Sequence, residues 1–225
     1  MRRFVIVMRV IMMVLIVTAL VATLTDVSGR VPDSYIDLVT YFTLQVNVAC
    51  LGVWGALTWH AVRRSTPAPW VEYGRAFIAA NLAIVAVIYW GSVFPLGTQD
   101  GPQLAWVMVI SHVVTPLYVI ADQALVGTRR PLPWRHLWIV SGYATLYVGL
   151  TLGRGAIGGW VPYDYLKADA GYGPVVSTVL IHGTLLVVFS AVAMRWRSAR
   201  RIADPSAVPV GEPGVMLEPA RARVR

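Results

Sequence analysis

The stretch VIVMRVIMMVLIVTALVATL, residues 5–24, decides the fold class of this chain. Its only charged side chain is Arg9. A helix of about 20 mainly apolar residues is long enough to cross a hydrocarbon core of roughly 30 Å. The stretch follows Arg2 and Arg3, as a signal peptide would, but its apolar run is longer than a signal core and no small-x-small cleavage site follows it. We therefore predict a retained membrane helix.

Five further apolar stretches of comparable length follow along the chain. Of the 225 residues, 57% are hydrophobic and only 13% are charged, whereas about a quarter of the residues in a soluble domain are charged. We expect an all-α fold, a polytopic bundle of six transmembrane helices in residues 1–197, and a disordered basic cytoplasmic tail in residues 198–225. The predicted spans are Val5–Leu24, Tyr35–His60, Ala76–Phe94, Leu104–Leu125, His136–Leu152 and Pro174–Met194.

The basic residues are divided unequally between the two sides of the predicted bundle. One side receives 16 of the 19 lysine and arginine side chains, and the other side receives six aspartates. Cytoplasmic loops carry the excess of basic residues, so we expect both termini in the cytoplasm. The net charge of +8 forms no patch with interleaved aromatic residues, which argues against a nucleic-acid partner. The preference for arginine over lysine is typical of a high-GC bacterial genome and predicts a bacterial cytoplasmic (inner) membrane.

Three polar residues are placed at a similar depth in the predicted spans. Ionisable residues inside a membrane are expensive to bury and are candidates for function, and His112 and His182 are of this kind. Together with Thr43, each lies eight residues inside the outer end of its span. At a rise of 1.5 Å per residue, all three lie about 12 Å below the outer boundary. We expect these three side chains to share one layer of the bundle interior.

The surroundings of Thr43 and His112 add polar groups to this layer. Asn47 is predicted one turn below Thr43 on the same helix face, and Thr40 one turn above it. A structural explanation is also open, since Thr in a membrane helix usually bonds its own backbone and Asn often joins helices. Pro116 has no N–H, so it leaves the carbonyl of His112 without its helical donor. A water, a polar ligand or a neighbouring Ser or Thr is needed to satisfy that carbonyl.

Three motifs resemble those of a known family. Residues 41–47, YFTLQVN, resemble the Phe-Thr-x-Gln-x-Asn signature of bacterial six-span membrane proteins related to the animal androgen-induced proteins. Residues 112–116, HVVTP, with Asp122 after them, resemble the His–Pro stretch of that family. Residues 160–166, WVPYDYL, resemble its Trp-Tyr-Pro-Tyr-Pro-Phe-Leu loop. The resemblance extends over roughly residues 35–194.

The resemblance implies a hydrolase. Animal members of that family are threonine hydrolases that cleave fatty-acid esters of hydroxy fatty acids with one intramembrane Thr and one intramembrane His. It implies Thr43 as the nucleophile, His112 as its base and a lipid or fatty-acid ester as the partner, without a metal or a cofactor. A Thr hydroxyl needs an adjacent base to take its proton, and His is suited to that task. Asn47 or His182 is expected to donate to the oxyanion.

The connection at residues 153–173 carries glycines and aromatic residues and is expected to form either a lid over the outer face or an ordinary aromatic belt. If a carboxylate orients His112, Asp164 of this connection is the candidate, and otherwise Thr43 and His112 act as a dyad. Asp122 is expected to pair with an arginine of the next loop, and Cys50 to be a buried thiol.

Other classes of function remain open at this point. The polar layer could hold a lipid or a small solute without chemistry, as in a binding or transport protein, although inverted repeats are not visible. His112 and His182 could ligate a haem iron from two sides. A structural or assembly protein is the third alternative.

Overall fold

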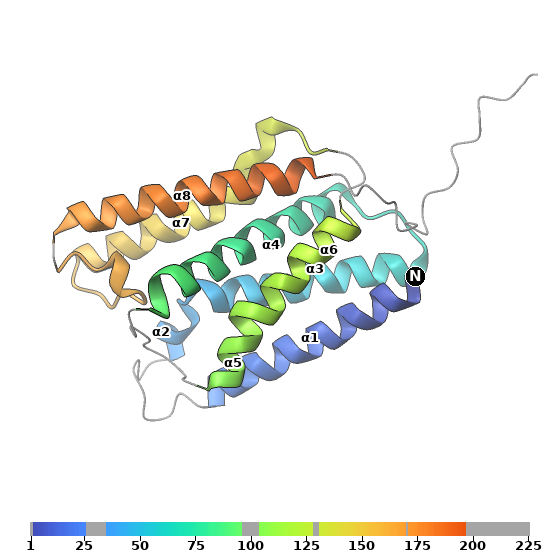
Figure 1. Cartoon of the computed structure of the whole chain (residues 1–225), viewed down its shortest axis with the longest axis horizontal. Coiled ribbons are helices and arrows are strands. Elements are labelled where there is room, and N and C mark those ends of the chain that lie inside the picture. Colours follow the sequence, from blue (N-terminus) through green and yellow to red (C-terminus); the bar gives the residue numbers. More distant parts are fainter. Residues whose placement is uncertain (1, 26–34, 96–103, 128–130, 170, 197–225) are drawn as a thin grey trace, which may run out of the picture.

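The chain folds as a bundle of helices that run alternately in opposite directions (Figure 1). The computed structural model describes residues 2–25, 35–95, 104–127, 131–169 and 171–196. Every regular element in this part of the chain is a helix, so the predicted all-α class is confirmed. The predicted tail at residues 198–225 lies outside the described residues. The bundle contains α1 (Arg2–Thr25), α3 (Phe42–Arg63), α4 (Pro69–Ile88), α6 (Thr115–Leu125), α7 (Leu137–Ala156) and α8 (Tyr172–Arg195).

Five helical stretches are long and apolar enough to cross a membrane. The chain is therefore a helical, multi-pass membrane protein. The predicted fifth span, His136–Leu152, corresponds to α7, which is not among the five. Glycine, serine, threonine and tyrosine residues lower the hydropathy of α7, and the helix continues to Ala156. The five stretches are Arg2–Thr25, Phe42–Arg63, Pro69–Val93, Ala105–Leu125 and Tyr172–Arg195.

Helix α4 is the central element of the bundle. It contacts α3, α6, α7 and α8, and half of its most apolar window is buried inside the protein. Pro69 occupies its start, where a missing N–H costs no helical bond. At its C-terminal end α4 passes directly into a π-helical turn, η1 (Tyr89–Val93).

The fourth predicted span also contains a π-helical turn. A short helix, α5 (Ala105–Val109), continues through η2 (Ile110–Val114) into α6. The Thr115 N–H donates to the carbonyl of Ile110, five residues earlier. The helical turn that precedes Pro116 is therefore wider than a turn of an α-helix. Turns of this kind occur mostly inside α-helices and often at functional sites.

The predicted second span, Tyr35–His60, is not one continuous helix. A short helix, α2 (Tyr35–Val39), ends before Tyr41, whose backbone is extended, and α3 then begins at Phe42. Thr40 turns back on the preceding segment, and its hydroxyl donates to the carbonyl of Asp37 over 2.5 Å. The prediction that Thr40 stacks one turn above Thr43 is therefore wrong, because the helix is interrupted between them.

Helix α1 is attached to the bundle by a buried ion pair. The Arg9 guanidinium donates two bonds to Oδ1 and one to Oδ2 of Asp122, at 3.1, 2.8 and 3.0 Å. Both side chains are almost fully buried, with exposures of 3% and 4%. The prediction that Asp122 pairs with an arginine of the next loop is wrong, since its partner comes from the first helix. Cys50 is buried, as expected.

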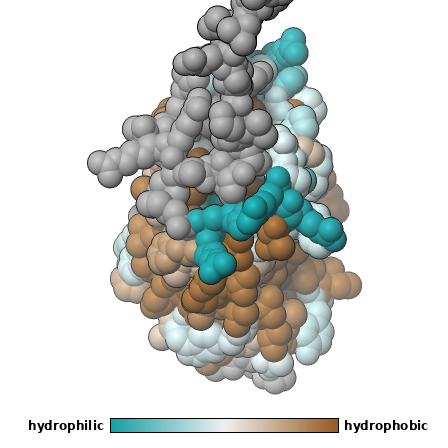
Figure 2. Space-filling view, turned by 90° about the vertical axis from the view of Figure 1, so that its right-hand side faces the viewer, coloured by the Kyte–Doolittle hydropathy of each residue, from teal (hydrophilic) through white to brown (hydrophobic). Residues whose placement is uncertain are grey.

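The two kinds of surface are separated on the molecule. Figure 2 views the end of the bundle at which α1 begins, where hydrophilic side chains form a band and hydrophobic side chains lie below it. The flank presents exposed apolar residues such as Val14, Leu146 and Leu180, as a surface in contact with lipid requires.

Candidate active site

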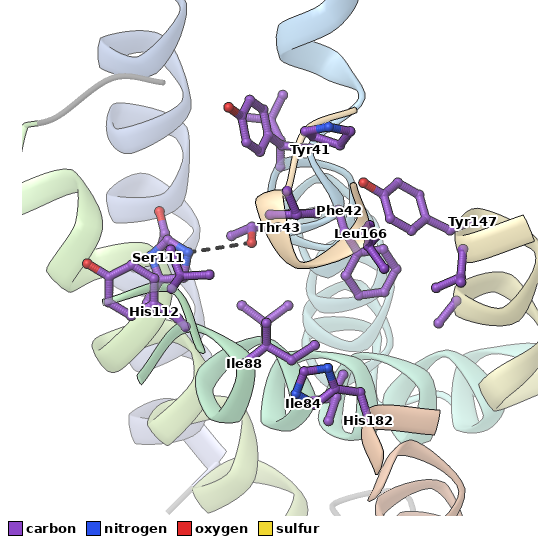
Figure 3. Close-up of a pocket in the computed structure, with 18 of the residues that line it drawn as sticks. Tyr41, Phe42, Thr43, Ile84, Ile88, Ser111, His112, Tyr147, Leu166 and His182 are labelled. Atoms are coloured by element: carbon purple, nitrogen blue, oxygen red, sulfur yellow. Dashed lines mark hydrogen bonds between the residues drawn. The ribbon is translucent and has the colours of Figure 1, made fainter. Parts of the chain in front are cut away.

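A cavity of about 310 Å³ opens between the helices near the end of the bundle that holds α2. Residues of α1, α3, α4, α7 and α8 line it, together with both π-helical turns and the connection between α7 and α8. Thr43, Asn47, His112 and His182 all border this cavity, and Figure 3 shows Thr43, His112 and His182 around it. The structure thus places the four sequence-predicted site residues around one space.

Thr43 and His112 are brought into contact within this space. The Thr43 Oγ1 atom lies 3.5 Å from the His112 Nε2 atom, along the dashed line in Figure 3. Both side chains are half-buried. The distance is at the long limit of a hydrogen bond, as is common for catalytic contacts before a substrate is bound. The two residues are 69 positions apart in the chain and come from different helices.

The other side of the His112 ring is fixed by its own helix. Nδ1 lies 3.1 Å from the carbonyl oxygen of Met108, one turn earlier. A carbonyl only accepts, so Nδ1 carries the hydrogen and the neutral ring presents Nε2 to Thr43 as a proton acceptor. The Tyr89 ring stacks on the imidazole at a centroid distance of 3.9 Å and an interplanar angle of 20°. The contact with Met108 fixes the tautomer, and the stacked Tyr89 ring restricts the orientation of the imidazole.

Thr43 lies in the first turn of α3, where backbone N–H groups have no acceptor within the helix. Tyr41 precedes the helix and makes no side-chain capping bond. The hydroxyl of Tyr163, from the connection after α7, approaches this end instead. Burial raises the pKa of Tyr163, and hydrogen bonds with the Thr43 side chain and with the backbone of Thr43 and Phe42 offset part of that rise. A neutral phenol therefore lies beside the Thr43 hydroxyl and the start of the helix.

Asn47 and His182 differ in their relation to the Thr–His pair. The Asn47 amide donates to the carbonyl of Thr43 over 2.8 Å, so it supports the first turn of α3. His182 lines the cavity from α8, but its contacts are with Ser92, 3.5 Å from Nε2, and with the edge of the Tyr165 ring. Its contacts therefore join η1 to the loop after α7.

The connection between α7 and α8 packs against the end of the cavity that lies near Tyr41. The Tyr41 ring meets Trp160 and Tyr163 edge to face, at centroid distances of 5.5 and 5.6 Å. Val161 and Leu166 are buried in a small apolar cluster with the start of α8. A Cβ atom at position 155 would lie 2.8 Å from Val161, which explains the glycine there. Four residues of this segment, Pro162, Tyr163, Tyr165 and Leu166, line the cavity.

Asp164 does not orient His112. Its carboxylate forms an ion pair with Lys167 and is largely exposed. Met108 supplies the orienting acceptor instead, and the four-residue spacing from Met108 to His112 could have indicated this contact. No sequence signal indicated the contact of Tyr89 with the His112 ring, because Tyr89 lies in a π-helical turn. The resemblance of residues 160–166 included Tyr163 but did not place it beside Thr43.

No group of three or more His, Cys, Asp or Glu side chains suited to a metal ion occurs among the described residues. Comparisons with protein-family models, with curated proteins and with solved structures find no match to this chain. The fold and the cavity therefore define its class: a helical, multi-pass membrane protein with a Thr–His pair in a mainly apolar cavity.

Proposed function

We propose that this protein is an intramembrane lipid-ester hydrolase in which Thr43 is the nucleophile and His112 the base. The observation that carries the proposal is the contact between Thr43 Oγ1 and His112 Nε2, with Nδ1 held by Met108. The surrounding cavity is mainly apolar and suits a fatty-acid ester. The resemblance of residues 41–47 and 112–116 to intramembrane threonine hydrolases supports the same roles.

The geometry of the pair supports a reaction in two halves. His112 Nε2 takes the Thr43 hydroxyl proton as the oxygen attacks the ester carbonyl, and the imidazolium then returns this proton to the departing alkoxide. The product of this half is an acyl ester on Thr43 and a free alcohol. In the second half, His112 takes a proton from water, the hydroxide attacks the acyl group, and Thr43 regains its proton as the fatty acid leaves.

Negative charge develops on the carbonyl oxygen in both halves. The Tyr163 hydroxyl and the backbone amides of the first turn of α3 are candidate donors beside Thr43, and the positive end of the helix dipole favours an anion there. Asn47 acts on this region indirectly, because its amide holds the Thr43 carbonyl. We assign it a positioning role in place of the predicted oxyanion contact.

A fluorophosphonate probe tests the nucleophile directly. Purified protein is expected to form a phosphonyl ester at Thr43, seen by peptide mass spectrometry, with loss of fluoride. Thr43→Ala should abolish labelling and His112→Ala should reduce it strongly, because the hydroxyl then lacks a base. Thr145→Ala is a matched control, since Thr145 lines the same cavity outside the pair. Equal labelling of wild type and Thr43→Ala would refute the assignment.

A lipid-binding protein is the second candidate, favoured by the apolar lining of the cavity. In that case Thr43 and His112 would hold the polar end of a lipid, and no ester turnover would depend on either. The same labelling experiment, combined with an ester assay, distinguishes the two functions.

We further propose six spans, with both termini in the cytoplasm of a bacterium. Helix α7 lies beside α8 over much of its length in Figure 1 and contacts α4 as well. The distribution of basic residues favours this orientation, although Arg9 is buried in α1 and contributes to no loop. An impermeant thiol reagent added outside should label Asp100→Cys but not Arg129→Cys, both in a Cys50→Ala background. The reversed pattern would contradict the topology.

A further inference from the structure

The lining of the cavity has a chemical character that limits its ligand. None of the described residues that border it is Asp, Glu, Lys or Arg. Its polar groups are hydroxyls, the Asn47 amide and the two imidazoles. An ionised group placed in such a space would lose its hydration without gaining a counter-charge, which is costly at membrane depth.

Two basic side chains near the outer end of the bundle are already engaged. Arg154, in the last turn of α7, forms an ion pair with Asp37 of α2. Lys167, after η4 (Asp164–Leu166), forms one with Asp164. Among these two described cations, a carboxylate or phosphate on a ligand would gain a partner only by displacing Asp37 or Asp164.

The cavity also extends along α8. Along α8 its lining runs from Thr178 to Leu186, which corresponds to about 12 Å of helix. Ile84 of α4 and Ala144 of α7 border it together with Leu186, and all of these are apolar. A volume of about 310 Å³ is at the lower end of the range of roughly 300–1,000 Å³ for small-molecule pockets. One acyl chain suits this space better than two.

We propose that the substrate is an uncharged ester with a single acyl chain, which lies along α8 toward Leu186. The neutral alcohol part would lie under the aromatic rings of Tyr41 and Tyr163. This inference rests on the proposed hydrolase function and refines its substrate. It sets this chain apart from an enzyme that requires a free carboxylate on its ester, and from one that acts on charged diacyl phospholipids.

A matched pair of substrates tests the charge requirement. A fatty-acid ester of a hydroxy fatty acid and its methyl ester share the same scissile bond and differ only in a remote carboxylate. At pH 8 in detergent micelles, we expect kcat/KM for the free acid to be lower by about 100-fold, the order set by an unpaired charge at membrane depth. Equal rates, or faster cleavage of the free acid, would overturn the proposal.

Leu186 tests the position of the chain. Leu186→Ala should shift the preferred acyl length upward by about three methylene groups, the volume that the side chain loses, and Leu186→Phe should shift it downward. Val188→Ala is the control, because Val188 is exposed on the same helix and does not line the cavity. Unchanged chain-length profiles in both Leu186 variants, if both are folded, would contradict the assigned position.

Binding in the Thr43→Ala variant separates this inference from the proposed chemistry. A diazirine-bearing fatty-acid methyl ester should cross-link to the peptide that contains Leu186, whereas the corresponding free acid should do so much less. If wild type shows no turnover but this preference is found, the hydrolase assignment fails and the ligand class stands. If turnover depends on Thr43 but both probes cross-link equally, only the ligand class fails.

Discussion

Thr43→Ala, His112→Ala and the double variant are expected to retain nearly the same residual ester hydrolysis, lower than wild type by about 10³-fold or more. The reason is the contact of 3.5 Å between Thr43 Oγ1 and His112 Nε2. A base without a nucleophile transfers no useful proton, and a hydroxyl without a base is a weak nucleophile. Losses within such a unit do not add. The measurement is kcat/KM for a neutral fatty ester, with each variant shown to be inserted and monodisperse.

Conservative variants around the pair separate the roles further. Thr43→Ser should retain part of the activity, because a hydroxyl remains in nearly the same place. Tyr163→Phe should lower kcat by about 10²-fold if its hydroxyl donates to the oxyanion, with Tyr165→Phe as the control. Asn47→Ala should cause a loss of about 10²-fold or less, through the displaced first turn of α3. Full hydrolysis in Thr43→Ala would discard the mechanism.

The apolar lengths in the sequence were sufficient to predict most of the fold. Runs such as residues 5–24 leave few alternatives to a membrane helix, because backbone groups in lipid must be satisfied internally. The break after α2 was not predictable in the same way. Tyr35–His60 has the composition of one span, and its interruption depends on tertiary contacts, such as those of Tyr41 with Trp160 and Tyr163.

The depth argument predicted that Thr43, His112 and His182 lie together, and they do border one cavity, but part of its reasoning was incorrect. It counted eight residues from Tyr35 to Thr43 along one helix, whereas Thr43 lies in the first turn of α3. The agreement with His112 persists because α2 and the extended residue after it still occupy the outer end of the span. A π-helical turn sets the orientation of His112, and periodicity assumed for a regular helix cannot predict its direction.

The ion pair of Arg9 and Asp122 is another contact that the sequence alone could not predict. Both residues were visible as charges in apolar runs, but they are 113 positions apart, and a nearer loop arginine was the simpler partner for Asp122. The packing of the helices determines that Arg9 is the partner of Asp122, because α1 contacts η2 and α5 as well as α3. A charge inside a predicted span therefore indicates that a partner exists without identifying it.

Arg9→Ala is expected to destabilise the protein by about 3–5 kcal/mol, because it leaves the Asp122 carboxylate buried without its partner. The effect should appear as a large fall in the midpoint of thermal unfolding in detergent micelles. Arg3→Ala provides the control, since Arg3 is exposed on the same helix. Arg9→Lys should recover only part of the loss, because an ammonium cannot reproduce the three bonds of the guanidinium.

Removing both charges shows whether the ion pair adds net stability or only offsets the cost of burying its two charges. The double variant Arg9→Met with Asp122→Leu should unfold at or above the midpoint of either single variant, since replacing a buried ion pair by apolar residues of similar size is often neutral or favourable. Its ester hydrolysis should remain near that of wild type, because Leu20 and Thr23, the residues of α1 that border the cavity, lie more than two turns from Arg9. If Arg9→Ala alone unfolds like wild type, then the pair does not attach α1 to the bundle.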